Sequence, residues 1–193
     1  MVIKIGITGS IGMGKSTVAS IFKKKNIAIW DADLEVHNLY KKGNEGYNLI
    51  TSIYPQVKGS DKIDRKKLSI LIKKKEINLK KVENLIHPLL IKSRINFIEK
   101  NKKDKFIVFD IPLLYETRAE KWLDYVILVY CSYKNQEKRL SMRENYNKKK
   151  IKYLLSNQLN MKQKKHLANF IINTDQPIEL VEKQVIETIH AID

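Results

Sequence analysis

The chain has 193 residues, which is enough for one domain of ordinary size with a small insertion and too few for two independent domains. Its composition, 43% hydrophobic and 30% charged, is typical of globular proteins, and its longest uncharged apolar run, 125–131, is far shorter than the roughly 20 residues that span a bilayer. The beginning of the chain lacks the pattern of a secretory signal, so we expect a cytoplasmic protein without a membrane partner. Cys131 is the only cysteine, which excludes an intramolecular disulfide, and its apolar neighbours favour a buried thiol over a reactive one.

The net charge of +16 raises nucleic acid as a candidate partner. Of the 37 basic residues, however, 32 are lysine and only five are arginine. The lysines are spread over the whole chain among many Ile and Asn residues, all types with A/T-rich codons. Biased genome composition explains this pattern at least as well as a binding face does, and we therefore expect no specific nucleic-acid partner.

Hydrophobic periodicity predicts strands that alternate with helices. Continuous apolar runs, typical of strands covered on both faces, predict five strands at residues 2–8, 27–30, 106–109, 125–130 and 170–172. Helical patterns separate the strands, from 16–25 after the first strand to 177–192 at the end of the chain. The fold class is therefore α/β, with a five-stranded, mostly parallel sheet flanked by helices.

The interval between the second and third strands runs from Asp31 to Lys105, whereas a simple crossover needs about a dozen residues. Helical patterns fill it at 34–40, 46–53, 65–74 and 82–99. We expect an inserted helical subdomain over residues 34–104 and a core domain formed by residues 1–33 and 105–193. A basic segment at about 136–165 is predicted to form a lid within that core domain.

Residues 9–16, GSIGMGKS, match the pattern G-x-x-x-x-G-K-[ST] directly after the first strand and at the start of a helix. The glycines allow the backbone to wrap around phosphates, with amide groups and the helix dipole directed inward. Lys15 is expected to reach the β- and γ-phosphates and Ser16 to hold Mg²⁺. The glycine spacing differs from the G-x-G-x-x-G of dinucleotide-binding folds. The sequence therefore predicts a site for a nucleoside triphosphate with Mg²⁺.

Three aspartates follow predicted strands, at the edge where an open α/β sheet binds its ligand. Asp31 and Asp33 come after the second strand, and Asp110 ends the third. A carboxylate in this position can accept the proton of an attacking hydroxyl or help to hold Mg²⁺. Asp33 is the favoured functional candidate, although it could instead cap the following helix. For Asp31 and Asp110, functional and structural interpretations stay open.

The motifs together resemble the dephospho-CoA kinase family, and the resemblance covers nearly the whole chain. They stand in the family's order: ITGSIGMGKST at 7–17, DAD at 31–33, GSDKIDRKKL at 59–68, HPLL at 87–90, DIPLLYE at 110–116, QEKRLSMRE at 136–144, and Gln158. Many families share the glycine-rich loop, but the combination of DAD, HP and PLLxE is specific. The resemblance implies that ATP phosphorylates the ribose 3′-hydroxyl of 3′-dephospho-CoA, which gives ADP and coenzyme A.

The resemblance also implies a role for individual residues. Asp33 would be a base or an orienting group, and Arg139 and Arg143 would neutralise charge on the transferring phosphoryl group. The residues expected to bind ATP are Gly12, Met13, Gly14, Lys15, Ser16 and Thr17, and the candidate Mg²⁺ ligands are Ser16, Asp33 and Asp110. The residues expected on the acceptor side are His87, Pro88, Leu113 and Glu116, with Arg65 in the packing or on the substrate face of a CoA-binding subdomain.

One segment departs from the family pattern. Near the fifth strand the chain reads ANFIINTDQ at 168–176, with Asn169 in place of an aspartate and without the family's glycine. We expect this segment to lie near the adenine. The alternatives are another nucleoside or nucleotide kinase and, in a different class, a basic nucleic-acid-binding ATPase. The expected assembly is a monomer or a small homo-oligomer.

Overall fold

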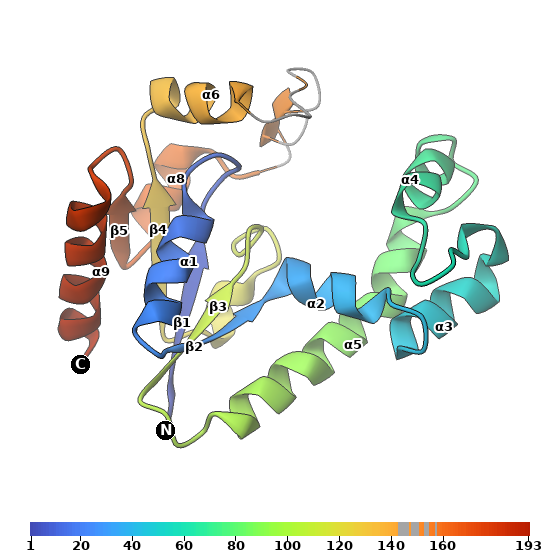
Figure 1. Cartoon of the computed structure of the whole chain (residues 1–193), viewed down its shortest axis with the longest axis horizontal. Helices are drawn as coiled ribbons and strands as arrows, with labels where there is room; N and C mark the ends of the chain where they lie inside the picture. The colour runs from blue at the N-terminus through green and yellow to red at the C-terminus, as the bar shows by residue number, and fades with distance from the viewer. Residues whose placement is uncertain (143–146, 148–150, 153–154, 157) are drawn as a thin grey trace. The chain divides into compact units, whose positions relative to one another are not determined.

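The computed structural model describes residues 1–142, 147, 151–152, 155–156 and 158–193. The chain divides into two compact units (Figure 1). One consists of Met1–Trp30 with Asn101–Asp193, and the other is Asp31–Lys100. Within the described residues, no helix is both long enough and apolar enough to cross a bilayer.

The first unit is built on a five-stranded sheet with the strand order β2-β3-β1-β4-β5. The strands are β1 (Ile3–Thr8), β2 (Ala28–Asp31), β3 (Phe106–Asp110), β4 (Tyr125–Tyr130) and β5 (Phe170–Asn173). β1 pairs in parallel with β3 and with β4, and β4 pairs in parallel with β5. The predicted α/β class with a parallel sheet is confirmed. The central position of β1 places the loop that follows it between the ends of β3 and β4.

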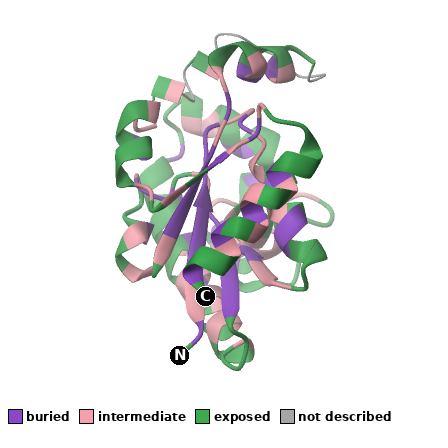
Figure 2. Cartoon of the chain, turned by 90° about the vertical axis from the view of Figure 1, so that its left-hand side faces the viewer, coloured by how far each residue is buried: buried purple, intermediate pink, exposed green. Residues whose placement is uncertain are grey.

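Helices α1 (Lys15–Lys24) and α9 (Ile178–Ile192) contact each other and share one apolar core with the sheet. Val18, Ile21 and Phe22 of α1 are buried there with the inward residues of β1, β3 and β4. Figure 2 shows that the central strands are coloured almost entirely as buried. Because both faces of these strands are covered, their sequences are continuous apolar runs rather than alternating ones.

An aromatic cluster surrounds Phe109 of β3, a residue that is not part of the core shared with α1 and α9. The rings of Trp30 and Phe109 have centroids 5.9 Å apart, and Phe109 meets Trp122 edge-on at 4.9 Å. Trp122 ends the 3₁₀ helix η2 (Ala119–Trp122). Helices α6 (Tyr133–Ser141) and α8 (Met161–Leu167) complete the labelled elements of this unit.

The second unit contains α2 (Ala32–Leu39), α3 (Glu45–Ile53), the 3₁₀ helix η1 (Pro55–Val57), α4 (Arg65–Lys73) and α5 (Leu79–Lys100). Its four α-helices correspond to the four helical patterns in the sequence. The unit has its own core, in which Ile50, Val57 and Ile63 are fully or almost fully buried. A hydrogen bond of 2.6 Å from Ser93 Oγ to Glu35 Oε2 links α5 to α2.

Candidate functional site: a phosphate-binding loop and its supports

The glycine-rich loop, residues 9–16, turns the chain from β1 into α1 and needs glycine at two positions. Gly12 and Gly14 have φ angles of +83° and +88°, which side-chain-bearing residues adopt at a cost. A Cβ atom on Gly14 would lie 2.9 Å from Thr174 Oγ1, and one on Gly12 would lie 2.9 Å from Leu140 Cγ. Glycine is therefore favoured at both positions for two reasons: the φ angles are positive, and neighbouring side chains leave no room for a Cβ atom.

Lys15, the first residue of α1, forms an ion pair with Asp110, the last residue of β3. The Lys15 side chain is 18% exposed and that of Asp110 only 6%. The parallel register pairs Asp110 with Ile7 of β1, which places the carboxylate beside the loop that follows β1. The sequence left the role of Asp110 open, and the structure brings this residue into contact with the cation of the loop.

Arg139 of α6 is bound to the segment that follows β5. Its Nη1 donates a 2.8 Å hydrogen bond to Thr174 Oγ1, and its Nη2 donates to the carbonyl of Thr174. The hydroxyl of Thr174 in turn donates to the carbonyl of Met13 in the loop, at 2.7 Å. A second link from α6 is the 2.7 Å hydrogen bond from Gln136 Nε2 to the carbonyl of Ile11. Helix α6 is thus fastened to the loop at two points, and Arg143 lies outside the described residues.

Asp175 anchors the beginning of α6. Its carboxylate accepts hydrogen bonds from the amide and the hydroxyl of Ser132, at 2.8 and 3.1 Å, and from Asn135 Nδ2 at 2.6 Å. Desolvation raises the pKa of Asp175, but the hydrogen bonds from Asn135 and Ser132 outweigh it and leave this pKa below the ordinary aspartate value. The segment after β5 therefore holds α6 at its start through Asp175 and along its length through Thr174.

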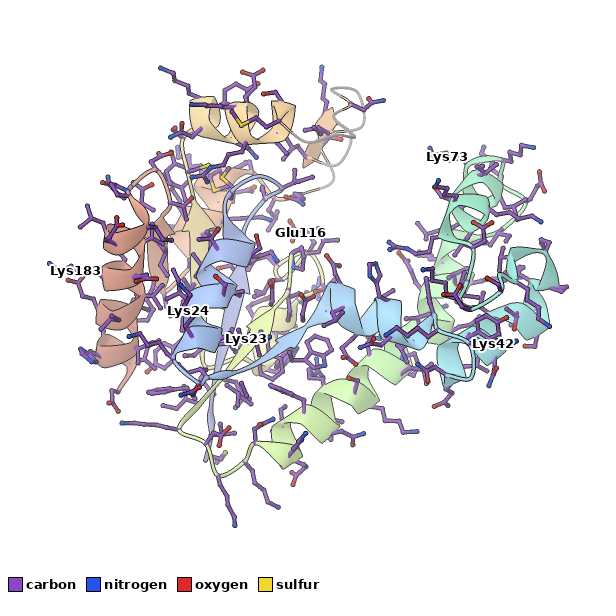
Figure 3. All side chains as sticks on the ribbon, in the orientation of Figure 1. Lys23, Lys24, Lys42, Lys73, Glu116 and Lys183 are labelled. Atoms are coloured by element: carbon purple, nitrogen blue, oxygen red, sulfur yellow. The ribbon has the colours of Figure 1, made fainter. Side chains whose placement is uncertain are left out.

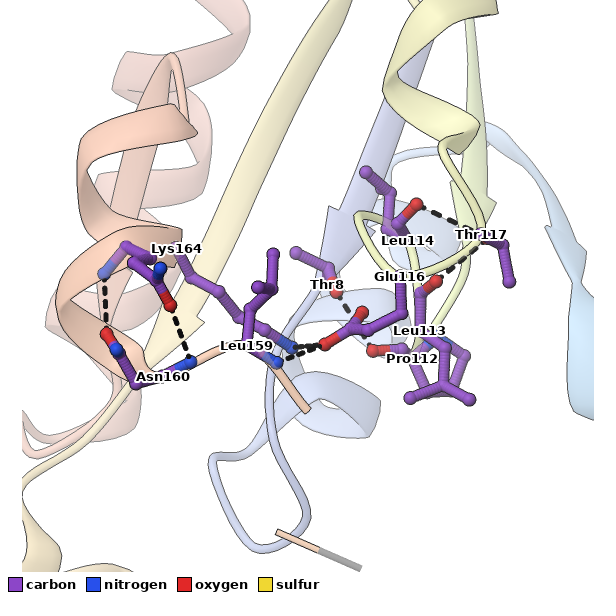
Figure 4. A network of polar contacts seen from close by, with 10 residues as sticks. Thr8, Pro112, Leu113, Leu114, Glu116, Thr117, Leu159, Asn160 and Lys164 are labelled. Atoms are coloured by element: carbon purple, nitrogen blue, oxygen red, sulfur yellow. Dashed lines mark hydrogen bonds and ion pairs between the residues drawn. The ribbon is translucent and has the colours of Figure 1, made fainter. Parts of the chain in front are cut away.

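Glu116 belongs to the loop after β3 and is tied to a lysine that no motif contains. Its Oε1 lies 2.9 Å from Nζ of Lys164 and accepts a 2.8 Å hydrogen bond from the amide of Leu159 (Figure 4). The Lys164 side chain is 0% exposed. Glu116 Oε2 is also buried and has no hydrogen-bond partner among the described residues. Nearby, Thr8 Oγ1 at the end of β1 donates to the carbonyl of Pro112 at 3.1 Å, which joins this loop to the sheet edge where the phosphate-binding loop begins.

The two aspartates after β2 have different local roles. Asp31 Oδ1 accepts a 3.0 Å hydrogen bond from the amide of Leu34 and is the N-cap of α2. The sequence allowed Asp33 to cap this helix. The helix begins at Ala32, directly after β2, so Asp31 is the residue that caps it. Asp33 lies exposed in the first turn of α2, in the second unit.

The remaining acceptor-side candidates lie in two places. His87 and Pro88 are exposed on α5, and Pro88 stands inside that helix. Arg65 begins α4, where its Nη1 contacts His37 Nε2 of α2 within the second unit. In the first unit Leu113 is 42% exposed, whereas the adjacent Leu114 is fully buried.

Asn169, in the segment 168–176, is hydrogen-bonded to β4. Its Oδ1 accepts a 2.8 Å hydrogen bond from the amide of Val126, and its own amide donates to the Val126 carbonyl at 3.0 Å. It thus pairs with β4 just before β5 begins, at the sheet edge opposite to the phosphate-binding loop. The far end of the segment, at Thr174, reaches the loop, and the expectation that this segment lies near the adenine stays a prediction.

The comparisons with known proteins agree on one family. A family model described as dephospho-CoA kinase matches residues 3–179. The dephospho-CoA kinase of Bartonella henselae is 36% identical over 190 residues, which cover 97% of each chain. That of Bartonella quintana is 37% identical over 187 residues, which cover 96% of this chain and 95% of the relative.

Solved structures give the same fold. The dephospho-CoA kinase from Campylobacter jejuni superposes with a TM-score of 0.72 at 25% identity, covering 100% of this chain and 98% of that one. A Thermus thermophilus protein superposes with a TM-score of 0.85 at 22% identity, covering 98% and 97% of the two chains, and this likeness supports the fold alone.

Proposed function

The chain belongs to the dephospho-CoA kinase family, and we propose how its residues carry out that family's reaction. The activity is the final step of coenzyme A biosynthesis, in which ATP phosphorylates 3′-dephospho-CoA and yields ADP and coenzyme A. The observation that best supports a phosphoryl-transfer role in this chain is the contact between Lys15 of the loop and the buried Asp110.

ATP is bound by the loop residues Gly12 to Thr17. The positive φ angles of Gly12 and Gly14 support this assignment, because such a backbone can direct successive amide groups at phosphate oxygens. The β- and γ-phosphates compete with Asp110 for the ammonium group of Lys15. The ammonium group already lies at the end of β3. To bind the phosphates, Lys15 therefore exchanges Asp110 for phosphate oxygens with little movement of the backbone.

Mg²⁺ fits the oxygen donors at the start of α1 and at the end of β3. In sites that also bind phosphates it takes only one or two protein ligands, and the exposed hydroxyl of Ser16 and the carboxylate of Asp110 are suitable oxygen donors in the first unit. When bound there, the ion would neutralise charge on the phosphate oxygens. Asp33, which belongs to the second unit, stays a candidate Mg²⁺ ligand on the sequence resemblance alone.

Asp33 is the proposed base or orienting group for the 3′-hydroxyl of the acceptor. Its carboxylate is exposed and carries no capping hydrogen bond, whereas that of Asp31 is engaged with Leu34. Arg139 and Arg143 are the proposed cationic partners of the transferring phosphoryl group. The two hydrogen bonds from Arg139 to Thr174 support this role, since they hold its guanidinium beside the loop.

The acceptor-side assignments combine exposed groups of each unit with one buried carboxylate oxygen. Leu113 offers an apolar contact, and Glu116 Oε2 is an acceptor oxygen not used by another described residue. His87 and Pro88 on α5, with Arg65 on α4, are the proposed contacts of the second unit with the coenzyme A moiety. ATP and dephospho-CoA are thus the proposed partners, and a monomer or small homo-oligomer stays the predicted assembly.

The test is an assay of ADP release in which dephospho-CoA, adenosine and AMP are offered in parallel, with the position of the new phosphate determined by NMR. Of the three acceptors, we expect only dephospho-CoA to be phosphorylated, with the new phosphate on its ribose 3′-oxygen. Phosphorylation of adenosine or AMP at a comparable rate would favour a broader nucleoside or nucleotide kinase.

The matched variants for this assay are D33N and D31N. We expect D33N to lower kcat about 100-fold, because general-base or orienting assistance is lost while the size of the side chain is kept. D31N retains the oxygen that accepts from Leu34, so its kcat should stay near the wild-type value. Equal rates for D33N and the wild type would remove Asp33 from the mechanism without affecting the identity of the substrate.

A further inference from the structure

Thr174 lies at the junction of three segments that are distant in the sequence. It immediately follows β5, its amide donates to the carbonyl of Tyr130 at 2.8 Å, and it is only 5% exposed. Its hydroxyl meets Arg139 of α6 and Met13 of the phosphate-binding loop, the latter 161 positions away in the chain. The backbone of Thr174 is thus hydrogen-bonded to β4, and its side chain contacts both the loop and Arg139.

The chemistry of the two neighbours restricts what can stand between them. An arginine guanidinium only donates hydrogen bonds, and a backbone carbonyl only accepts them. The side chain between Arg139 and Met13 must therefore accept on one side and donate on the other, as a hydroxyl does. Valine has the same shape as threonine but can do neither.

The contact with Gly14 makes this linkage stiff. The site where a Cβ of Gly14 would stand is 2.9 Å from Thr174 Oγ1, 3.1 Å from its Cγ2 and 3.2 Å from Arg139 Nη1. The side chain of Thr174, the guanidinium and the backbone of the loop therefore touch one another at a single point. A shift of the loop relative to α6 cannot occur without a change in these contacts.

We infer that Thr174 is a positioning residue for phosphoryl transfer, which fixes the Arg139 guanidinium relative to the phosphate-binding loop. The inference rests on the proposed role of Arg139 as a cationic partner of the transferred group. Thr174 affects the rate of phosphoryl transfer through Arg139, because it orients the guanidinium before the reaction begins.

The first experiment compares T174V with T174S and T174N by steady-state kinetics with ATP and dephospho-CoA. T174V should lower kcat about 10-fold, the size expected for one hydrogen bond to a charged group, with little change in the KM for ATP. T174S and T174N keep one group that accepts and one that donates, so they should restore most of the rate. The inference is overturned if T174S and T174N are as slow as T174V.

A matched control separates this role from simple loss of a buried hydroxyl. Thr188 in α9 is also buried, and its hydroxyl donates to the Gln184 carbonyl at 2.8 Å, away from the loop. T188V removes the same atom in the same kind of environment and should leave kcat unchanged. Thermal unfolding of both variants shows whether each is folded at the assay temperature; a kcat loss in T188V equal to that in T174V would contradict the inference.

The decisive measurement is a double-mutant cycle with R139A. If Thr174 acts through Arg139, T174V should lower kcat in the wild type and have almost no further effect in R139A. Additive losses would show that Thr174 acts independently, which overturns the inference and leaves the role of Arg139 intact. An unchanged kcat in R139A alone would instead remove the proposed role of that arginine, and the inference with it.

Discussion

At the scale of single residues, burial decides chemical behaviour that residue type leaves open. Cys131 is fully buried under the phosphate-binding loop, with Sγ 3.5 Å from Met13 Sδ and 3.8 Å from the Gly12 carbonyl. Burial raises the pKa of its thiol, and the nearby Arg139 only partly offsets this increase. The buried thiol that the sequence favoured is confirmed.

Cys131 should therefore react slowly with thiol reagents in the folded protein. A raised pKa leaves less thiolate at any given pH, and the thiolate is the nucleophile, so labelling by a disulfide reagent at pH 8 should be slow in native protein and fast in denaturant. The labelled fraction can be followed by absorbance over time. Equal labelling rates with and without denaturant would show that the thiol is accessible in the native state.

At the scale of elements, the buried pair Glu116–Lys164 joins the loop after β3 to α8. Removing one member of such a pair leaves an uncompensated charge in a place that water cannot reach, which costs about 3–5 kcal/mol of unfolding free energy, whereas removing both members costs less. Because the Lys164 side chain is fully buried and that of Glu116 is only 16% exposed, we expect this asymmetry to be large for this pair.

K164M should accordingly lower the unfolding free energy by about 3 kcal/mol, as measured by urea denaturation. The double variant E116Q/K164M should be more stable than K164M alone, since the unpaired carboxylate is then neutral. K162M is the control, because Lys162 lies exposed on the same helix and its removal should change stability little. If K164M and K162M have the same unfolding free energy, the Glu116–Lys164 pair does not contribute to stability.

At the scale of the whole molecule, the charge of +16 is carried by many dispersed side chains. Lys23 and Lys24 end α1, Lys73 ends α4 and Lys183 lies on α9, and these labelled side chains extend from different elements in Figure 3. Some meet exposed acidic partners, such as Glu182 at 3.5 Å from Lys24, and contacts of this kind contribute little stability. The charge is therefore not a reason to expect a nucleic-acid partner.

Binding of DNA or RNA should consequently be weak and should disappear between low and physiological salt, because dispersed lysines make only nonspecific phosphate contacts. Phosphorylation of dephospho-CoA should persist over the same range, since the contacts of Lys15 act at short range in a partly buried place where screening is weaker. Fluorescence anisotropy with labelled oligonucleotides and the ADP-release assay measure the two quantities side by side. Tight binding at physiological salt together with nucleic-acid-stimulated ATP hydrolysis would revive the ATPase alternative.

The sequence by itself determined the features that depend on neighbouring residues. The strand cores and the four helices of the second unit follow from local hydrophobic periods, and GSIGMGKS defines a phosphate-binding loop because its glycines and its lysine act within one turn of chain. Element ends shifted by only a few residues, although one such shift gave the N-cap of α2 to Asp31 rather than Asp33.

Only the tertiary structure decided which polar residues support the loop. Thr174 meets Met13 across 161 positions, and nothing in the local pattern after β5 marks that contact. Lys164 is one of 32 lysines, and its sequence neighbourhood resembles that of exposed ones until the fold places Glu116 against it. The physical reason is the same in both cases: the role of a polar side chain is set by the partner that the fold brings to it and by the water that the fold excludes, and a linear pattern carries neither.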